Sequence, residues 1–164
     1  MKWPKTYHLP SSLTLTADDK RLDSVEQFAG KQVIITEKLD GECTSLHFDL
    51  VHARSESSGH QQWRSLVKSL HAQIRSWIPQ NIQLVGENVY AMHSIFYDSL
   101  TSYFYLFSVI DKEKGVVLSV DEILEWAEIL EIPFVPILYR GIFRYPDLRI
   151  ELWPDAYQFV SREV

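Results

Sequence analysis

A polar turn between two strand-like runs is the feature that most constrains the fold. Residues 31–38 and 42–50 are rich in Val, Ile, Thr and Phe, which fit the half-buried surface of a β-sheet. The turn between them places Lys38 and Asp40 at strand ends. A third short strand is expected at residues 51–54, so this region predicts a β-sheet whose edge carries a lysine.

Two amphipathic segments predict helices. The first precedes Pro79, and the second begins at Ser119, which forms a capping-box pattern with Glu122 and ends before Pro133. The apolar residues at helical spacing in the first segment are Trp63, Leu66, Val67, Leu70, Ile74, Trp77 and Ile78.

Further strands are expected on both sides of these helices. Residues 1–30 are loop-like except for a helical turn near residues 25–28, and a turn-rich connection covers residues 145–154. The expected strands are residues 82–90, 102–111, 116–119, 134–141 and 157–164.

The pattern predicts an α+β fold of mixed, largely antiparallel β-sheets with packed helices. The 164 residues, 46% of them hydrophobic, fit one domain that spans residues 1–164. The net charge of −6 argues against a broad basic face for duplex nucleic acid. The single cysteine, Cys43, excludes an internal disulfide, and neither a signal peptide nor a membrane span is evident, so a cytoplasmic location and no membrane partner are expected.

Lys38 is flanked by three acids, Glu37, Asp40 and Glu42. A neutral lysine amine can attack phosphoryl centres, but neighbouring carboxylates favour the ammonium form. A reactive Lys38 therefore requires positive charge to enter with the substrate, and a magnesium nucleotide supplies it. Gly41 would let the backbone approach such a ligand closely. From this segment alone, an ordinary polar turn containing Asp-Gly is the alternative.

Four ordered segments resemble the covalent nucleotidyltransferases, the superfamily of ATP-dependent ligases and capping enzymes. The run from Lys38 to Gly41 matches K-x-D-G, and "HARSES" supplies Arg54 and Ser55 as in the second block of that superfamily. "LVGENVYAMHSIFYDSL" resembles the G-E-N-x-Y-A-x-H-S-I-x-Y stretch of a group of RNA ligases, and "YFYLFSVID" resembles their Y-F-x-x-F-D-I strand. With the opening "KTYHLPSS", the resemblance covers residues 6–111.

The resemblance implies an ATP-grasp-like ligase adenylation domain in which Lys38 takes AMP from ATP as a phosphoramidate, with Mg²⁺ or Mn²⁺ as the metal. Arg54 would lie near the ribose and phosphates, and Ser55 belongs to the same block. Glu87 would accept a hydrogen bond from a ribose hydroxyl or hold the metal. Phe107 would stack on adenine.

The remaining implied roles belong to residues beside the lysine. Glu37 would line the adenine pocket through its backbone, and Asp40 and Gly41 complete the nucleotide-binding signature. The implied RNA partners are a 5′-phosphate end, which receives AMP, and a 3′-hydroxyl, which displaces AMP to seal the strand. An end-healing partner is not identified by the sequence.

Each role has a structural alternative. Arg54 and Glu87 also suit an ion pair, and Phe107 suits the core. His93 fits a hydrogen-bonded structural role better than that of a ligand. The six histidines and Cys43 show no zinc spacing.

Two departures from the family pattern leave the function open. Ser108 replaces the usual aspartate, and the family's E-G-x-V block and lysine-bearing strand are absent before Val164. These blocks supply a metal-binding glutamate and lysines for the α-phosphate, so a C-terminally incomplete ligase domain is expected. The alternatives are a non-catalytic nucleotide-binding or regulatory fragment, and a DNA ligase or capping guanylyltransferase.

Overall fold

The chain divides into two compact units in the computed structural model, which describes residues 3, 6–10, 12, 17, 19–54 and 62–144. One unit comprises Met1–Trp3 and Lys38–Val135, and the other comprises Pro4–Glu37 and Pro136–Val164. The expected strand at residues 157–164 and the turn-rich connection at residues 145–154 lie outside the described residues.

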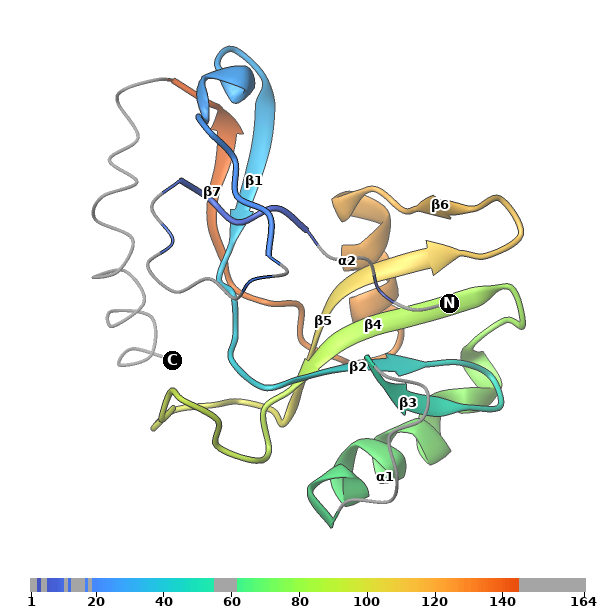
Figure 1. Ribbon diagram of the computed structural model, residues 1–164. Coiled ribbons are helices and arrows are strands. Elements are labelled where there is room, and N and C mark those ends of the chain that lie inside the picture. Colours follow the sequence, from blue (N-terminus) through green and yellow to red (C-terminus); the bar gives the residue numbers. More distant parts are fainter. Residues whose placement is uncertain are drawn as a thin grey trace. The chain divides into compact units, whose positions relative to one another are not determined.

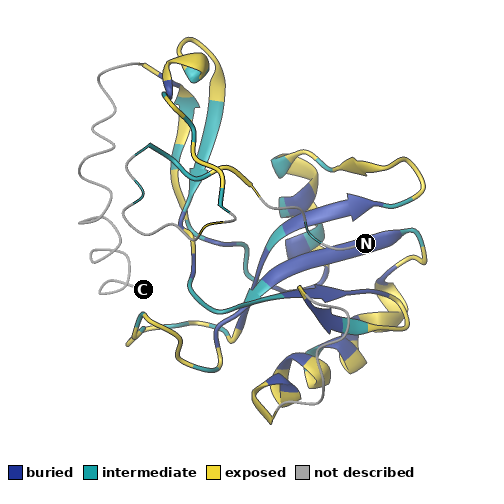
Figure 2. Cartoon of the chain, viewed as in Figure 1, coloured by how far each residue is buried: buried dark blue, intermediate teal, exposed yellow. Residues whose placement is uncertain are grey.

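The first unit is built on a five-stranded antiparallel sheet with the order β3-β2-β4-β5-β6 (Figure 1). Two neighbouring strands, β4 and β5, are almost entirely buried, including the polar Gln83 and Asn88 of β4 (Figure 2). The mixed, largely antiparallel α+β fold is therefore confirmed. The strands of this sheet are β2 (Glu42–Leu46), β3 (Val51–Ala53), β4 (Ile82–Asn88), β5 (Phe104–Asp111) and β6 (Val116–Val117).

Both predicted helices cover one face of this sheet. Helix α1 (Ser65–Ile74) is shorter than its apolar pattern suggests, because 3₁₀ turns at Gln62–Arg64 and Arg75–Trp77 extend it at each end. Helix α2 (Val120–Ile129) begins with the predicted capping box of Ser119 and Glu122. The main core lies between the helices and the sheet, and it includes Leu46, Val67, Ile74, Leu84, Phe104, Leu106, Ile123 and Ala127.

The opposite face of the sheet carries a second apolar cluster of Leu39, Val89, Tyr105 and Val135, with Phe107 packed against it. Phe104 and Leu106 face the main core, so the alternation of the strand turns Tyr105 and Phe107 to this opposite face, and a β-bulge follows. Val85 pairs with Ser108 and Gly86 pairs with Leu106, so Phe107 has no partner on β4. Bulges of this kind redirect a side chain and are frequent beside active sites.

The second unit contains an antiparallel pair, β1 (Gln32–Thr36) with β7 (Ile137–Ile142). A 3₁₀ turn at Glu26–Phe28 precedes β1, as expected, and β7 begins three residues later than predicted. The strands on either side of Lys38 therefore belong to different sheets, so the lysine lies on a connection and not in a hairpin turn. Within the described residues, no helix is long and apolar enough to cross a membrane.

Two buried histidines on β3 and the end of β2 form a hydrogen-bonded chain. His52 Nδ1 lies 2.7 Å from the carbonyl oxygen of Ala53, which can only accept, so Nδ1 carries the proton. His52 Nε2 then accepts from His47 Nε2 at 3.0 Å. His47 Nδ1 is left as an acceptor that faces Lys112 Nζ at 3.5 Å. Both rings are neutral in this arrangement, because a further proton would place two donors face to face.

This chain makes stability sensitive to acid. Burial, followed by the positive charge of Lys112 and by the neighbouring His52 ring, lowers the pKa of His47 from 6.5 to about 4. Between these pH values the unfolded chain binds a proton that the folded chain does not, so stability falls as the pH falls from 6.5 toward 4. We expect the wild type to lose about 2 kcal/mol more unfolding free energy between pH 7 and pH 4 than His47→Gln.

Urea unfolding at a series of pH values measures this difference. Lys68→Gln, which introduces glutamine at an exposed position of α1, is the control and should keep the wild-type pH dependence. Equal pH dependence in His47→Gln and the wild type would contradict the prediction.

Candidate active site

Glu87 on β4 organises the candidate site. It pairs across the sheet with Cys43 on β2, so both side chains lie on the face opposite the helices. Glu87 Oε1 accepts a hydrogen bond of 2.9 Å from the N–H of Gly41. This bond attaches the connection that carries Lys38 to the centre of the sheet.

The conformation of this connection depends on Gly41. A Cβ at this position would lie 2.4 Å from the carbonyl oxygen of Asn88 and 2.9 Å from its carbon. Any side chain would therefore push the connection away from β4. The close approach to β4 therefore explains why glycine occupies position 41, in addition to the expected approach to a ligand.

Asp40 ties the same connection to the segment that follows β4. Its Oδ2 accepts from the N–H of Ser94 (2.8 Å), the hydroxyl of Ser94 (2.6 Å) and the N–H of Ile95 (3.1 Å). Its own N–H donates to the hydroxyl of Tyr97 at 2.8 Å. Burial tends to raise the pKa of Asp40, but the hydrogen bonds from Ser94 and Ile95 outweigh it and hold the pKa below its usual value.

Glu87 occupies a less favourable environment for charge. Burial raises the pKa of its carboxyl above the usual value, against the lowering effects of the Gly41 hydrogen bond and the charge of Lys38. Asp40 adds to the rise and His93 opposes it. A cation that entered the site would relieve this cost, because it would favour the ionised carboxylate.

Lys38 and Arg54 share this environment and are both exposed. Burial, with a contribution from Glu87, raises the pKa of the Cys43 thiol to about 11. The charges of Arg54 and Lys38 both act in the opposite direction on this thiol. Strand pairing places Glu87 opposite Cys43, Arg54 follows Ala53, which pairs with Thr44, and the Gly41–Glu87 hydrogen bond holds the connection that carries Lys38 to the same part of the sheet.

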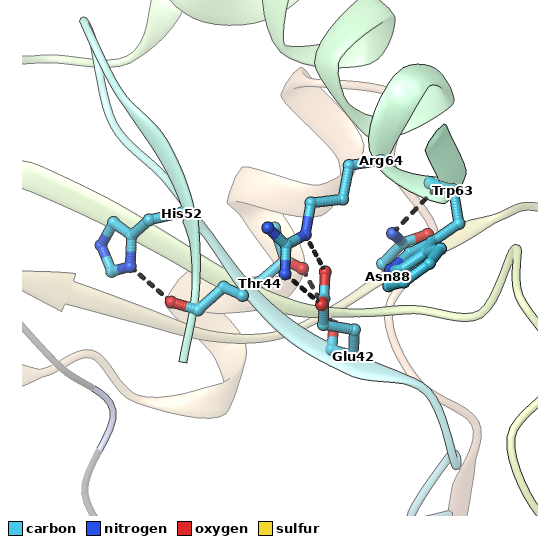
Figure 3. A network of polar contacts seen from close by, with 7 residues as sticks. Glu42, Thr44, His52, Trp63, Arg64 and Asn88 are labelled. Carbon is cyan, nitrogen blue, oxygen red and sulfur yellow. Dashed lines mark hydrogen bonds and ion pairs between the residues drawn. The ribbon is translucent and has the colours of Figure 1, made fainter. Parts of the chain in front are cut away.

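The third acid beside the lysine, Glu42, forms an ion pair with Arg64 and not with the candidate site. Figure 3 shows Arg64 reaching from the start of the α1 region to Glu42, with Nε at 2.6 Å from Oε2 and a terminal nitrogen at 2.5 Å from Oε1. These hydrogen bonds raise the pKa of Arg64, which is only 7% exposed. Asn88 donates to the carbonyl oxygen of Trp63 at 3.4 Å in the same network. Glu42 therefore anchors helix to sheet on the face away from Cys43.

Phe107 is half-buried on the same face as Glu87, against the cluster that contains Leu39. Leu39 follows Lys38 directly, so this apolar cluster and the lysine are neighbours. The ring of Trp3 meets Phe107 edge-on, with centroids 5.3 Å apart and an interplanar angle of 73°.

The position of two predicted site residues relative to the others stays a prediction. Glu37 ends the segment that belongs to the second unit, where its N–H donates to the carbonyl oxygen of Pro136. Burial raises the pKa of its carboxyl. Ser55 lies outside the described residues.

The sequence did not reveal the supporting roles of three residues. Ser94 and Tyr97 hold the connection at Asp40, and Cys43 lies between the charged groups. Ser94 and Tyr97 fall inside the "GENVYAMHSIFY" stretch, and this motif was the sequence feature that could have indicated their roles. Among the described residues, no three His, Cys, Asp or Glu side chains are arranged to hold a metal ion by themselves.

The fold and site together define an antiparallel nucleotidyltransferase-type α+β protein, in which a lysine lies on a connection that is hydrogen-bonded to a half-buried glutamate. The protein-family model described as RNA ligase matches residues 31–152. The chain therefore belongs to the RNA ligase family, which confirms the resemblance seen in the sequence.

Solved structures agree with this assignment. The chain is 25% identical to Naegleria gruberi RNA ligase with pyrophosphate, with a TM-score of 0.55 over 71% of this chain. It is 22% identical to a point mutant of that ligase with ATP and manganese, with a TM-score of 0.53 over 73% of this chain. The chain spans 39% and 40% of the lengths of these two structures. A comparison with curated protein sequences gives no match.

Proposed function

We propose that this chain is the adenylyltransferase domain of an ATP-dependent RNA ligase and that Lys38 is its nucleophile. The observation that supports this most strongly is the shared environment of Lys38, Arg54 and Glu87 around Cys43, in a chain of the RNA ligase family. An exposed amine near a half-buried carboxylate and a second cation suits attack on a phosphate.

The reaction would begin when the neutral amine of Lys38 attacks the α-phosphorus of ATP. A P–N bond forms, the bond to the β-phosphate oxygen breaks, and pyrophosphate leaves with that electron pair while the amine loses a proton. The AMP then passes to an RNA 5′-phosphate, and a 3′-hydroxyl displaces it to form the new phosphodiester. Each step exchanges one phosphoryl linkage for another, so positioning and electrostatics carry most of the catalysis.

The other residues would bind and orient the nucleotide. Arg54 would donate to the ribose or phosphates, with Ser55 beside it. Phe107 would stack on adenine while it keeps its edge-on contact with Trp3. Glu37 would line the adenine pocket through its backbone.

Glu87 would accept from a ribose hydroxyl or, with phosphate oxygens, hold Mg²⁺ or Mn²⁺. One carboxylate with nucleotide phosphates is a common way to bind Mg²⁺, and Naegleria ligase variants with ATP and manganese support a divalent cation here. When bound, the cation would neutralise charge on the phosphates. A cytoplasmic location is proposed with this function.

Radiolabelling tests the proposal. The chain is incubated with ATP or GTP carrying ³²P at the α-phosphate, with Mg²⁺ or Mn²⁺, and is then separated on a denaturing gel. We expect label from ATP and not from GTP, and a peptide adduct that maps to Lys38 by mass spectrometry. Label from GTP would favour a capping enzyme. ATP binding without an adduct would favour a non-catalytic nucleotide-binding module.

A further inference from the structure

The segment that joins β4 to β5, residues 89–103, exposes four large apolar side chains. We name it the β4–β5 connection, and Figure 2 shows that much of it is exposed beside the buried strands. Side chains of this size are normally buried, and several on one segment indicate a binding surface. The exposed fractions are 47% for Tyr90, 70% for Met92, 73% for Phe96 and 54% for Tyr103.

The backbone of this connection is held at several points. Thr101 and Ser102 donate their N–H groups to the hydroxyl of Tyr105 at 2.9 and 3.1 Å. The N–H of Val89 donates to the carbonyl oxygen of Tyr103 at 2.9 Å. Tyr97 packs against the apolar cluster beneath the connection. The exposed rings are therefore presented by an anchored segment, which reduces the entropy lost when they bind a partner.

The connection also borders the proposed nucleophile. Asp40, two residues after Lys38, is bonded to Ser94 and Ile95 in the middle of the connection. Phe96 follows directly in the sequence. The connection is therefore held next to the chain segment that carries Lys38.

The charges of the connection indicate how it would bind that end. Residues 89–103 contain no Lys or Arg, and their ionisable side chains apart from tyrosine are His93 and Asp98. Salt-dependent phosphate binding comes from Lys and Arg, whereas aromatic rings bind the faces of bases without sequence preference. We propose that the β4–β5 connection, with Phe96 at its centre, is a base-stacking surface for the terminal nucleotides of the RNA strand. This inference rests on the proposed RNA-sealing function.

The test compares RNA binding by the wild type, Phe96→Ala, Phe96→Leu and Phe96→Trp. The probe is a short single-stranded RNA with a 5′-phosphate, and its affinity is measured by fluorescence anisotropy over a range of salt concentrations. We expect Phe96→Ala and Phe96→Leu to bind about fivefold or more weakly. Phe96→Trp should bind like the wild type. The slope of affinity against salt should stay unchanged in all three, because no phosphate contact is lost.

Trp77→Ala is the matched control, because Trp77 is 67% exposed and lies on the 3₁₀ turn after α1. It should bind RNA like the wild type. Equal loss in Trp77→Ala, or unchanged affinity in Phe96→Ala, would overturn the inference. Full affinity in Phe96→Leu would also overturn it, and would indicate an apolar protein partner for this surface.

Two further readouts separate this inference from the proposed function. Photocrosslinking with RNA that carries 5-iodouridine should label peptides of the β4–β5 connection without ATP. Labelling of Lys38 by ATP without RNA should be equal in the wild type and the Phe96 variants. Labelling without any effect of Phe96 on RNA binding would defeat only the inference. A crosslink at the connection without adenylylation in any variant would defeat only the proposed function.

Discussion

Lys38→Ala is expected to abolish covalent labelling by α-³²P-ATP, the largest effect that we predict. The side chain is exposed, so its removal should change the free energy of unfolding by no more than about 0.5 kcal/mol. The loss would then report the missing nucleophile and not an unfolded chain. Labelling on a denaturing gel and urea unfolding of the same preparation measure the two quantities.

Lys38→Arg sharpens this prediction. Arginine keeps the positive charge, but its guanidinium stays protonated and cannot act as a nucleophile. We therefore expect ATP binding without label in this variant. Lys68→Ala, which removes an exposed lysine on α1, is the control and should label like the wild type. Label that persists in Lys38→Ala would show that another group accepts the AMP.

Arg64→Met is expected to lower the free energy of unfolding by about 3 kcal/mol, the largest predicted effect on stability. The methionine fills much of the same space, but it leaves the Glu42 carboxylate without its two hydrogen bonds from Arg64. The side chains of Arg64 and Glu42 are only 9% and 16% exposed, so water replaces the lost bonds poorly. Urea unfolding measures the change.

A double-mutant cycle identifies the cause. Glu42→Gln removes the negative charge, so the double variant Arg64→Met/Glu42→Gln should be more stable than Arg64→Met alone. Arg64→Lys should recover only part of the loss, because an ammonium cannot form the paired hydrogen bonds of the guanidinium. Strictly additive effects of the two single changes would show that the ion pair contributes nothing beyond packing.

Local chemistry made several elements predictable from the sequence. The capping box at Ser119 and Glu122 depends on residues three positions apart, and the structure contains it. The strands predicted at residues 82–90 and 102–111 correspond to β4 and β5. The ends of α1 were less predictable, because 3₁₀ turns continue the apolar spacing of a helix.

The candidate site divides in the same way. Lys38, Asp40 and Gly41 stand together in one motif, so the order of motifs alone was enough to indicate the RNA ligase family. The different binding partners of Asp40 and Glu42 could not be predicted from the sequence. Asp40 binds the β4–β5 connection and Glu42 binds Arg64, and both partners are distant in the sequence. Only strand pairing and helix packing brought them together.

The chain by itself determined where strands and helices form and which lysine stands in a nucleotidyltransferase motif, because propensity, capping and motif spacing act over a few neighbouring residues. Tertiary structure decided that the strands beside Lys38 join different sheets, that a bulge leaves Phe107 without a partner on β4, and that Glu87 faces Cys43. These outcomes depend on register between strands far apart in the sequence. A shift of one residue in that register would turn each side chain to the opposite face of the sheet.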